Sequence, residues 1–310
     1  MCSNHLPYYF VICQNVPSSR CQQTNTLVGT RLYFFGENNL TTFTSIEVWY
    51  LDLSSSFNIS TPPWHSDVVM SVGYNFGTSC LSPIDNSTVF LIGGRMLWLA
   101  TSATTDYYSN TSSVYQFNSK TLQWTTPTIN TFNSSFTSRN NIHIVIDKNG
   151  KIFIFGGTNF ISSTDTPNYT FYNDMNALDS TNMTWSTQTQ SQSTLTYVGY
   201  TATLLQNDLI VYIGGSSGSG TSVRLNDISQ NGNIIIYGAS THDSSGDIVY
   251  VFSDIAILNT NSWAQPQHQF HLQIIFILDI KNYTWVTAFS IPITTNPVKQ
   301  IQNNSNSSTD

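Results

Sequence analysis

Residues 149–157 read Asn-Gly-Lys-Ile-Phe-Ile-Phe-Gly-Gly: a turn pair, an apolar run and two glycines. Asn and Gly both tolerate the positive φ of a type I′ turn, so Asn149-Gly150 predicts a tight β-hairpin. The four residues from Ile152 to Phe155 are β-branched or aromatic and favour a strand. The glycines that follow indicate that the chain turns sharply where this strand ends. The stretch therefore predicts a hairpin whose second strand ends at a pair of glycines.

The same pattern of an apolar run ending at glycine occurs five times. We call these glycines the glycine marks: Gly36, Gly93, Gly94, Gly156, Gly157, Gly214, Gly215 and Gly238. A second apolar run, with Asp or Asn near its end, follows most of the marks and leads to a tryptophan: Trp64, Trp124, Trp185, Trp263 and Trp285. As far as Gly215 the marks lie 58, 63 and 58 residues apart. This regular spacing predicts an internally repeated fold.

Each repeat reads as strand, tight turn, strand ending in glycine, loop, strand, turn and a last strand that opens near tryptophan. That order predicts a four-stranded antiparallel sheet. One such sheet cannot bury both of its faces, whereas several sheets packed radially can. We interpret the glycines and tryptophans as architecture, because glycine adopts φ angles closed to other residues and tryptophan buries a large area.

With its diglycines after four apolar residues and its tryptophans in phase, the chain resembles the kelch repeats of the β-propeller superfamily that includes galactose oxidase. The resemblance implies an all-β, kelch-type β-propeller of four-stranded antiparallel blades, with tryptophans packed between neighbouring blades. We expect this propeller to span residues 23–290. A degenerate secretory signal segment is expected at 1–22, and a disordered polar tail at 291–310.

The repeat breaks after Gly215. The step from Gly214 to Gly238 is only 24 residues, and the step from Trp263 to Trp285 is only 22. The fourth unit thus has a first hairpin without a second, and the sixth has a second hairpin without a first. We interpret the chain as a six-bladed ancestor with two half-blades missing, through a damaged gene, mis-called splicing or real divergence. An open or distorted propeller is therefore expected.

Charged residues are scarce. Ten basic and 17 acidic side chains make up 9% of the 310 residues, against roughly 25% in an average domain. Such a chain has no positive field, which excludes a nucleic-acid binder that works through phosphate charge. No apolar run approaches the ~20 residues that a membrane-spanning helix needs. The hydrophobic fraction of 40% is enough to build a core.

Serine, threonine and asparagine occur 41, 39 and 31 times, which predicts a neutral surface rich in hydroxyl and amide groups. This composition favours a secreted or cell-surface protein, with a cytoplasmic location as the alternative. Ten N-x-S/T sequons are present, close to the number that the composition gives by chance: Asn39, Asn58, Asn86, Asn110, Asn133, Asn168, Asn182, Asn282, Asn303 and Asn306.

The cysteines are Cys2, Cys13, Cys21 and Cys80, and their spacing does not fit a zinc site. One disulfide between Cys21 and Cys80 is compatible with an oxidising compartment, and buried free thiols are the alternative reading.

The resemblance to a copper oxidase requires a test of the ligands. A galactose-oxidase-like centre would need two histidines, metal-bound tyrosines and a cysteine joined to one of the tyrosines. Only His268 and His271 lie close together among the six histidines, and no cysteine follows position 80. No nucleophile elbow or phosphate loop is present either. We therefore expect no cofactor, no metal and no catalytic residue, and the copper enzyme is kept only as an alternative.

In kelch adaptors the loops after the diglycine line the face where ligands dock. By position these residues here are Glu37, Arg95, Thr158, Asn159, Ser216 and Ser240. Arg95 stands out because an arginine at this place is a recurring ligand contact in kelch adaptors and can pair a carboxylate bidentately; a solvated loop arginine is the alternative. The resemblance implies a non-enzymatic module that binds an unknown protein or a glycan. A structural or relic member of a duplicated family is the other alternative.

Overall fold

The computed structural model describes residues 16–18, 20, 22–36, 45–98, 107–108, 113–130, 136–159, 170–188, 197–205, 207–217, 222–223, 226–230, 233–242, 248–259, 275–281 and 283–285. All of the regular secondary structure within these residues is β-strand. The described part of the chain contains no helix that could cross a membrane. The tail at 291–310 and most of the segment at 1–22 lie outside the described residues.

Four of the sheets are built alike. In each, four main strands pair antiparallel, in the order in which they follow one another along the chain. Sheet 1 consists of β1 (Thr24–Val28), β2 (Arg31–Phe35), β3 (Val48–Asp52) and β4 (Trp64–Ser66). Sheet 2 consists of β5 (Gly73–Leu81), β6 (Thr88–Trp98), β8 (Val114–Asn118) and β9 (Gln123–Thr125), with β7 (Tyr107–Tyr108) paired to the end of β6.

Sheet 3 consists of β10 (Val145–Ile146), β11 (Lys151–Phe155), β14 (Met175–Asp179) and β15 (Thr184–Gln188), and β12 (Thr158–Asn159) pairs separately with β13 (Thr170–Phe171). Sheet 4 consists of β16 (Tyr197–Leu204), β17 (Leu209–Ser217), β22 (Ile275–Asp279) and β23 (Thr284–Trp285), with β18 (Ser222–Val223) paired to β17. Sheet 5 has three strands, β19 (Asn226–Gln230), β20 (Asn233–His242) and β21 (Ile248–Asn259).

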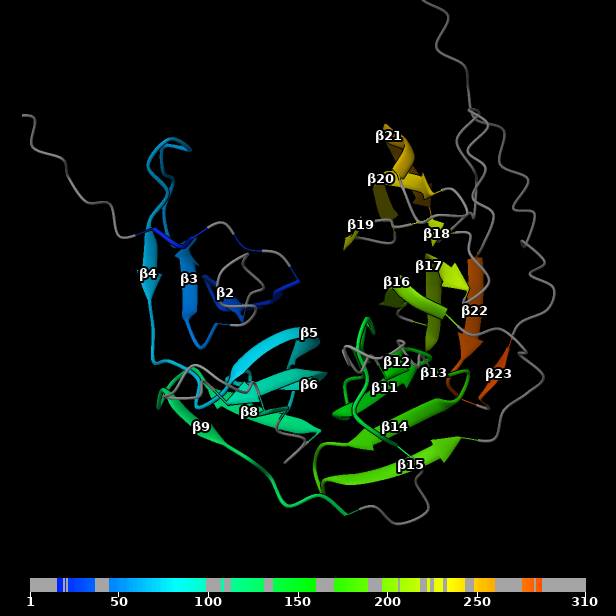
Figure 1. Ribbon diagram of the computed structural model, residues 1–310, viewed down its shortest axis with the longest axis horizontal. Coiled ribbons are helices and arrows are strands. Elements are labelled where there is room, and N and C mark those ends of the chain that lie inside the picture. Colours follow the sequence, from blue (N-terminus) through cyan, green and yellow to red (C-terminus); the bar gives the residue numbers. More distant parts are fainter. Residues whose placement is uncertain are drawn as a thin grey trace, which may run out of the picture.

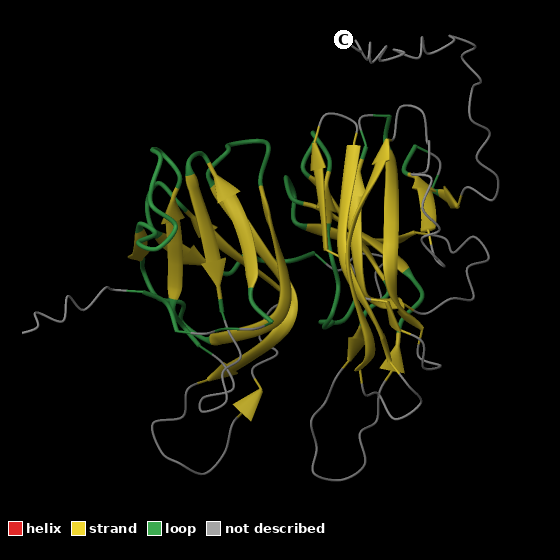
Figure 2. Cartoon of the chain, turned by 90° about the horizontal axis from the view of Figure 1, so that it is seen from above, coloured by secondary structure: helices red, strands yellow, loops and turns green. Residues whose placement is uncertain are grey.

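The sheets follow one another around an arc, with sheet 1 at one end and sheet 5 at the other (Figure 1). The first strand of each sheet lies innermost: β1 contacts β5, β5 contacts β10, β10 contacts β16 and β16 contacts β19. In Figure 2 most strands run up and down between two faces formed by turns and loops. Four-stranded antiparallel sheets packed radially are the arrangement that the repeat predicts.

Main-chain hydrogen bonds join the inner strands at one level of the arc. The N–H of Phe76 donates to the Gln22 carbonyl at 2.9 Å, that of Asn141 to the Phe76 carbonyl at 3.1 Å, and that of Gly199 to the Asn141 carbonyl at 2.9 Å. All four residues have a positive φ, between 56° and 66°. Because equivalent residues bond to one another, sheets 1 to 4 have the same orientation. Corresponding turns therefore lie on the same face of the arc.

The interfaces between successive sheets are built alike. In each sheet the tryptophan of the last strand belongs to a row of four residues that lie opposite one another across the strands. Sheets 2 to 4 each pack the face that carries this row on the preceding sheet. For sheet 2 this row is Leu81, Val89, Phe117 and Trp124. It packs on Tyr33 and Phe35 of sheet 1, and the rings of Phe35 and Trp124 meet edge to face with centroids 5.9 Å apart. Burial of these aromatic side chains is the main force that holds neighbouring sheets together.

Sheet 4 shows where the two incomplete repeats lie. Its first hairpin comes from the fourth repeat, and its second comes from the sixth. They meet where β17 pairs with β22, from Leu209 opposite Asp279 to Ile213 opposite Ile275. The two incomplete units thus form one complete sheet, because antiparallel strands can pair whatever length of chain joins them. Sheet 5 is part of the segment inserted between these two strands.

The turn between β5 and β6 contains a carboxylate with a low pKa. Asp85 accepts hydrogen bonds from the N–H groups of Ser87 and Thr88, both at 3.0 Å, and from the Thr88 hydroxyl at 2.5 Å. Partial burial raises the pKa of Asp85, but the hydrogen bonds lower it more, to about 2. A carboxyl whose pKa is depressed on folding stabilises the fold above its unfolded pKa of about 3.9, and this stabilisation is lost as the pH falls toward 2.

We expect Asp85→Asn to lower the free energy of unfolding at neutral pH by about 1 kcal/mol. The difference between wild type and variant should shrink as the pH falls from 4 to 2, because the Asp85 carboxylate of the wild type becomes increasingly protonated and loses its charge. Urea unfolding followed by circular dichroism at a series of pH values measures this difference. A difference that does not change with pH would show that the charge of Asp85 contributes nothing.

Candidate binding face

The second strands of several sheets continue past their glycine marks, where the sequence predicts a loop. Strand β6 runs through Gly93 and Gly94, β17 runs through Gly215, and β20 runs through Gly238. The prediction that these strands end at glycine is wrong. Neighbouring strands β7, β18 and β21 continue the antiparallel pairing beyond the glycines and hold the chain extended. In sheet 3, β11 does end before the glycines, and β12 follows them.

These continuations define a candidate binding face. We call it the ribbon face, and it consists of the paired segments β6–β7, β12–β13 and β17–β18. Each segment follows the second strand of its sheet, and sheets 2 to 4 have the same orientation. All three ribbons therefore leave the same side of the arc. The turns between first and second strands, and between third and fourth strands, lie on the opposite side.

Arg95 lies in β6 rather than in a loop. Arg95 pairs across the sheet with Asn75 of β5, and the Arg95 side chain is half-buried. The guanidinium lies over the ring of Phe76, 4.5 Å from the ring centroid. Phe76 adopts a φ of 58° and takes part in the hydrogen bonds of the inner strands, so its main chain is tightly held. The cation–π contact positions the Arg95 side chain against β5, the innermost strand of sheet 2.

Thr158 and Asn159 are less available to a ligand than Arg95. Thr158 is only 4% exposed, and its main chain exchanges two hydrogen bonds with Asn140. The expectation that Thr158 contacts ligand is therefore wrong, because the neighbouring segment covers it. The Asn159 side chain accepts a hydrogen bond from the Thr170 N–H at 2.7 Å, which stabilises the ribbon.

Ser216 and Ser240 lie in strands, where they pair with Ser222 and Val251 respectively. Glu37 lies outside the described residues, as does Trp263. Of the six predicted positions, Arg95 is the charged side chain that the described structure places on the ribbon face.

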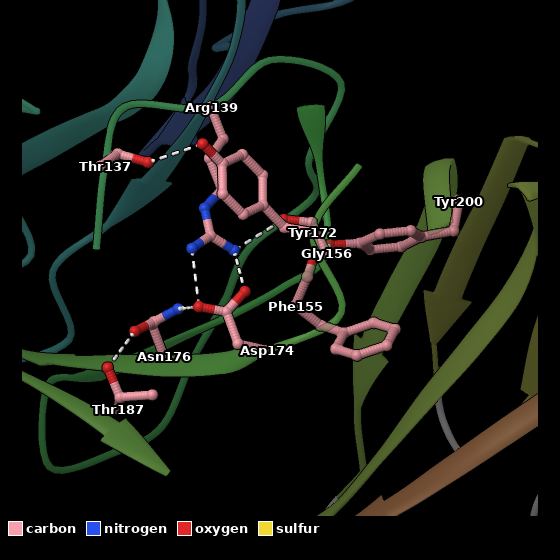
Figure 3. Close-up of polar contacts among 9 residues, drawn as sticks. All are labelled: Thr137, Arg139, Phe155, Gly156, Tyr172, Asp174, Asn176, Thr187 and Tyr200. Carbon is pink, nitrogen blue, oxygen red and sulfur yellow. Dashed lines mark hydrogen bonds and ion pairs between the residues drawn. The ribbon is translucent and has the colours of Figure 1, made fainter. Parts of the chain in front are cut away.

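Beneath this face lies a buried ion pair that the sequence pattern does not reveal. Arg139 donates to Asp174 through both terminal nitrogens, at 2.5 Å and 2.7 Å (Figure 3). It also donates to the Gly156 carbonyl at 3.0 Å. The ring of Tyr172 stacks on the guanidinium, 3.9 Å from its centroid. At 1% exposure, Arg139 is a structural residue and cannot reach a ligand.

The pKa of Asp174 is lowered. Burial raises it, but the hydrogen bonds and the charge of Arg139 outweigh that effect. Asn176 donates a further hydrogen bond to the same carboxylate at 2.9 Å and accepts one from Thr187 (Figure 3). These charge-assisted hydrogen bonds together fix the positions of the side chains that make them. They therefore hold the segment before β10 against β14.

The main chain of Arg139 explains why positions 93 and 94 are glycines. Its carbonyl accepts a hydrogen bond from the Gly94 N–H at 2.7 Å. A Cβ atom on Gly93 would collide with the same carbonyl oxygen. Sheets 2 and 3 thus approach backbone to backbone at this diglycine. Glycine is required here by its positive φ and also by the neighbouring sheet.

No signal used in the sequence analysis identifies the ion pair. Arg139 and Asp174 lie 35 residues apart, and neither forms part of the repeated glycine or tryptophan pattern. Phe76 was missed for a similar reason, because a positive φ at a phenylalanine leaves no trace in a sequence.

Metal-binding and redox-active side chains are sparse in the described ranges. No three His, Cys, Asp or Glu side chains gather there as metal ligands. His268 and His271 lie outside those ranges. Cys80 is buried as a free thiol, which agrees with the second of the two readings of the cysteines, and Cys21 lies outside the described residues. Burial raises the pKa of the Cys80 thiol far above its usual value, which makes this cysteine unreactive.

Comparison with known proteins supports the fold. No protein-family model matches the chain, and no curated protein matches its sequence. Among solved structures, it is similar to the structure of YjhT, a kelch-like β-propeller protein, with a TM-score of 0.56 at 13% sequence identity. The similarity covers 80% of this chain and 84% of that chain. The fold is all-β with antiparallel four-stranded sheets, and it is like that of a β-propeller.

Proposed function

We propose that this chain is a diverged kelch-repeat propeller that acts as a non-enzymatic binding module. Its ligand would be a protein or a glycan that carries a carboxylate, docked on the ribbon face. The observation that carries the proposal is the position of Arg95. Its guanidinium is held over Phe76 on a face where three ribbons leave the arc together.

The physical case rests on preorganisation. An arginine whose side chain is already held by a ring loses little conformational freedom when it binds. Its fork of donors matches the two oxygens of a carboxylate. Because only ten residues of the whole chain are basic, competing sites for an anion are few.

The proposal predicts that Arg95→Ala weakens binding at least about tenfold, the loss expected for one charge-assisted contact. The probes are panels of immobilised oligosaccharides and peptides, each panel holding acidic and neutral members. The control is Lys120→Ala, which removes the same charge from an exposed turn between β8 and β9, on the opposite side of the arc. Its binding should equal that of wild type.

Two results would contradict this function. One is no binding of wild type to any acidic probe. The other is an equal loss in both variants, which would indicate non-specific attraction. Circular dichroism of each variant confirms that the fold is retained.

We further propose that the protein is secreted or displayed at the cell surface and carries N-linked glycans. Three sequons in described segments, Asn58, Asn86 and Asn182, are exposed at turns opposite the ribbon face. Glycans there would leave Arg95 accessible. Asn39, Asn110, Asn133, Asn168 and Asn282 lie outside the described residues.

The mass of native protein before and after treatment with an N-glycosidase tests this location. A loss of mass, with conversion of these asparagines to aspartate, is expected. An unchanged mass would favour the cytoplasm.

A further inference from the structure

One connection in sheet 1 is longer than its counterparts in the other sheets. The turn between the third and fourth strands has four residues in sheets 2, 3 and 4, at 119–122, 180–183 and 280–283. In sheet 1 the same connection has eleven residues, 53–63, which we call the finger. The finger extends beyond the ends of β3 and β4 (Figure 1). Like the corresponding turns, it lies on the side of the arc opposite the ribbon face.

The finger is held by hydrogen bonds although it is exposed. At its base the Leu53 N–H donates to the Thr30 carbonyl at 2.7 Å, and at its tip the Thr61 N–H donates to the Asn58 carbonyl at 2.9 Å. Every residue from 53 to 61 is exposed. The sequence therefore forms a defined loop that no other part of the described chain covers.

The tip of the finger combines apolar side chains with a sequon. Asn58 is flanked by Phe57, which is 38% exposed, and by Ile59, which is 87% exposed. No residue from 53 to 63 is charged. Removing the two apolar side chains from water would be favourable. Asn58, Ile59 and Ser60 form an acceptor sequence for an N-linked glycan, which is itself a bulky group.

The side chain of Asn58 is oriented for modification. Its Oδ1 accepts a hydrogen bond from the Ser60 N–H at 2.9 Å, which turns Nδ2 away from the main chain of the loop. None of the described residues accepts a hydrogen bond from this Nδ2. At Asn182 the same nitrogen donates to Asp179 at 3.2 Å. Asn58 is therefore the more accessible of the two acceptors.

We propose that Asn58 carries an N-linked glycan whose innermost sugars pack on Phe57 and Ile59. This inference rests on the proposed secreted location, in which an oligosaccharide joined to a lipid pyrophosphate is the co-reactant. Nδ2 of Asn58 forms a bond to C1 of the first sugar and gives up one proton. The bond from C1 to the pyrophosphate oxygen breaks, and the lipid pyrophosphate leaves.

The place of attachment determines what the glycan touches. Because Asn58 lies between Phe57 and Ile59, the first sugars are within reach of both side chains. The C–H faces of sugar rings are apolar, so contact with these side chains removes apolar surface from water. The glycan leaves the ribbon face open, since the finger lies on the opposite side of the arc.

Retention on a hydrophobic-interaction column tests the contact, with protein made in a eukaryotic secretory host. Four proteins form a double-mutant cycle: wild type, Asn58→Gln, Phe57→Ser with Ile59→Ser, and all three substitutions together. The serine pair leaves the sequon intact. It should change the retention of the glycosylated protein little, because the sugars already cover both side chains. In the Asn58→Gln background it should shorten retention clearly.

The control is Val69→Ser, at a residue that is 52% exposed between β4 and β5. It should shorten retention equally with and without the Asn58 glycan. Circular dichroism verifies the fold of each variant, and mass spectrometry after N-glycosidase treatment verifies the glycan.

An equal effect of the serine pair in both backgrounds would overturn the proposal. So would an unmodified Asn58 in a protein that carries glycans at other sequons, a result that leaves the proposed location standing. A protein without any glycan would contradict both.

Discussion

Asp174→Ala is expected to lower the free energy of unfolding by about 3–5 kcal/mol. The substitution leaves the Arg139 guanidinium buried between sheets with no carboxylate to pair with. A buried charge without a partner costs far more than the net value of the ion pair. Because domains are stable by only about 5–15 kcal/mol, the variant should be close to unfolding. Urea unfolding, followed by tryptophan fluorescence, measures the loss.

The matched control is an ion pair on the surface. Lys281 and Asp208 approach to 3.4 Å, and both side chains are exposed. Lys281→Ala should cost less than about 1 kcal/mol, because water screens the charges. If the two variants lost equal stability, burial would not be what makes the Arg139–Asp174 pair important.

Gly93→Ala is expected to destabilise the protein by about 2–5 kcal/mol. Adopting the φ of 66° costs an alanine about 1–2 kcal/mol. The added Cβ atom also collides with the carbonyl of Arg139 and forces sheets 2 and 3 apart. Overpacking of this kind costs a further ~1–3 kcal/mol. The hydrogen bond from Gly94 to the same carbonyl should weaken as the sheets separate.

Gly199→Ala separates the two contributions. Gly199 has the same φ of 66°, but a Cβ atom there would meet nothing within 4 Å. This variant should lose only the conformational term, about 1–2 kcal/mol. Chemical denaturation of both variants gives the comparison. Equal losses would show that glycine is required at position 93 by backbone conformation alone and not by the close approach of sheet 3.

The local elements of this protein could be predicted from sequence because their causes are local. The apolar runs at Ile152–Phe155 and Ile210–Ile213 form strands, as their β-branched and aromatic residues predict. The Asn149-Gly150 pair lies in the turn that leads into β11, where Gly150 has a φ of 82°. Repetition at a regular spacing predicted the radial packing, because each sheet presents two apolar faces and must be covered on both.

Pairing across the break could not be predicted. The spacing after Gly215 indicates two incomplete units, yet β17 and β22 form one sheet across an insertion of more than 50 residues. Strand pairing depends on hydrogen bonds in space, and a long connection adds little to its entropic cost. A rule based on spacing identifies the incomplete units, but it does not say which strands pair with each other.

The candidate site divides in the same way. Sequence alone determined the repeated sheets, the glycine marks and the choice of Arg95 as a residue to examine. Only the tertiary structure decided that Arg95 lies over Phe76, that Thr158 is covered, and that Arg139 reaches Asp174. The reason is physical. A strand is favoured by neighbours in the chain, whereas a buried charge or a ring contact depends on groups that only the packing of sheets brings together.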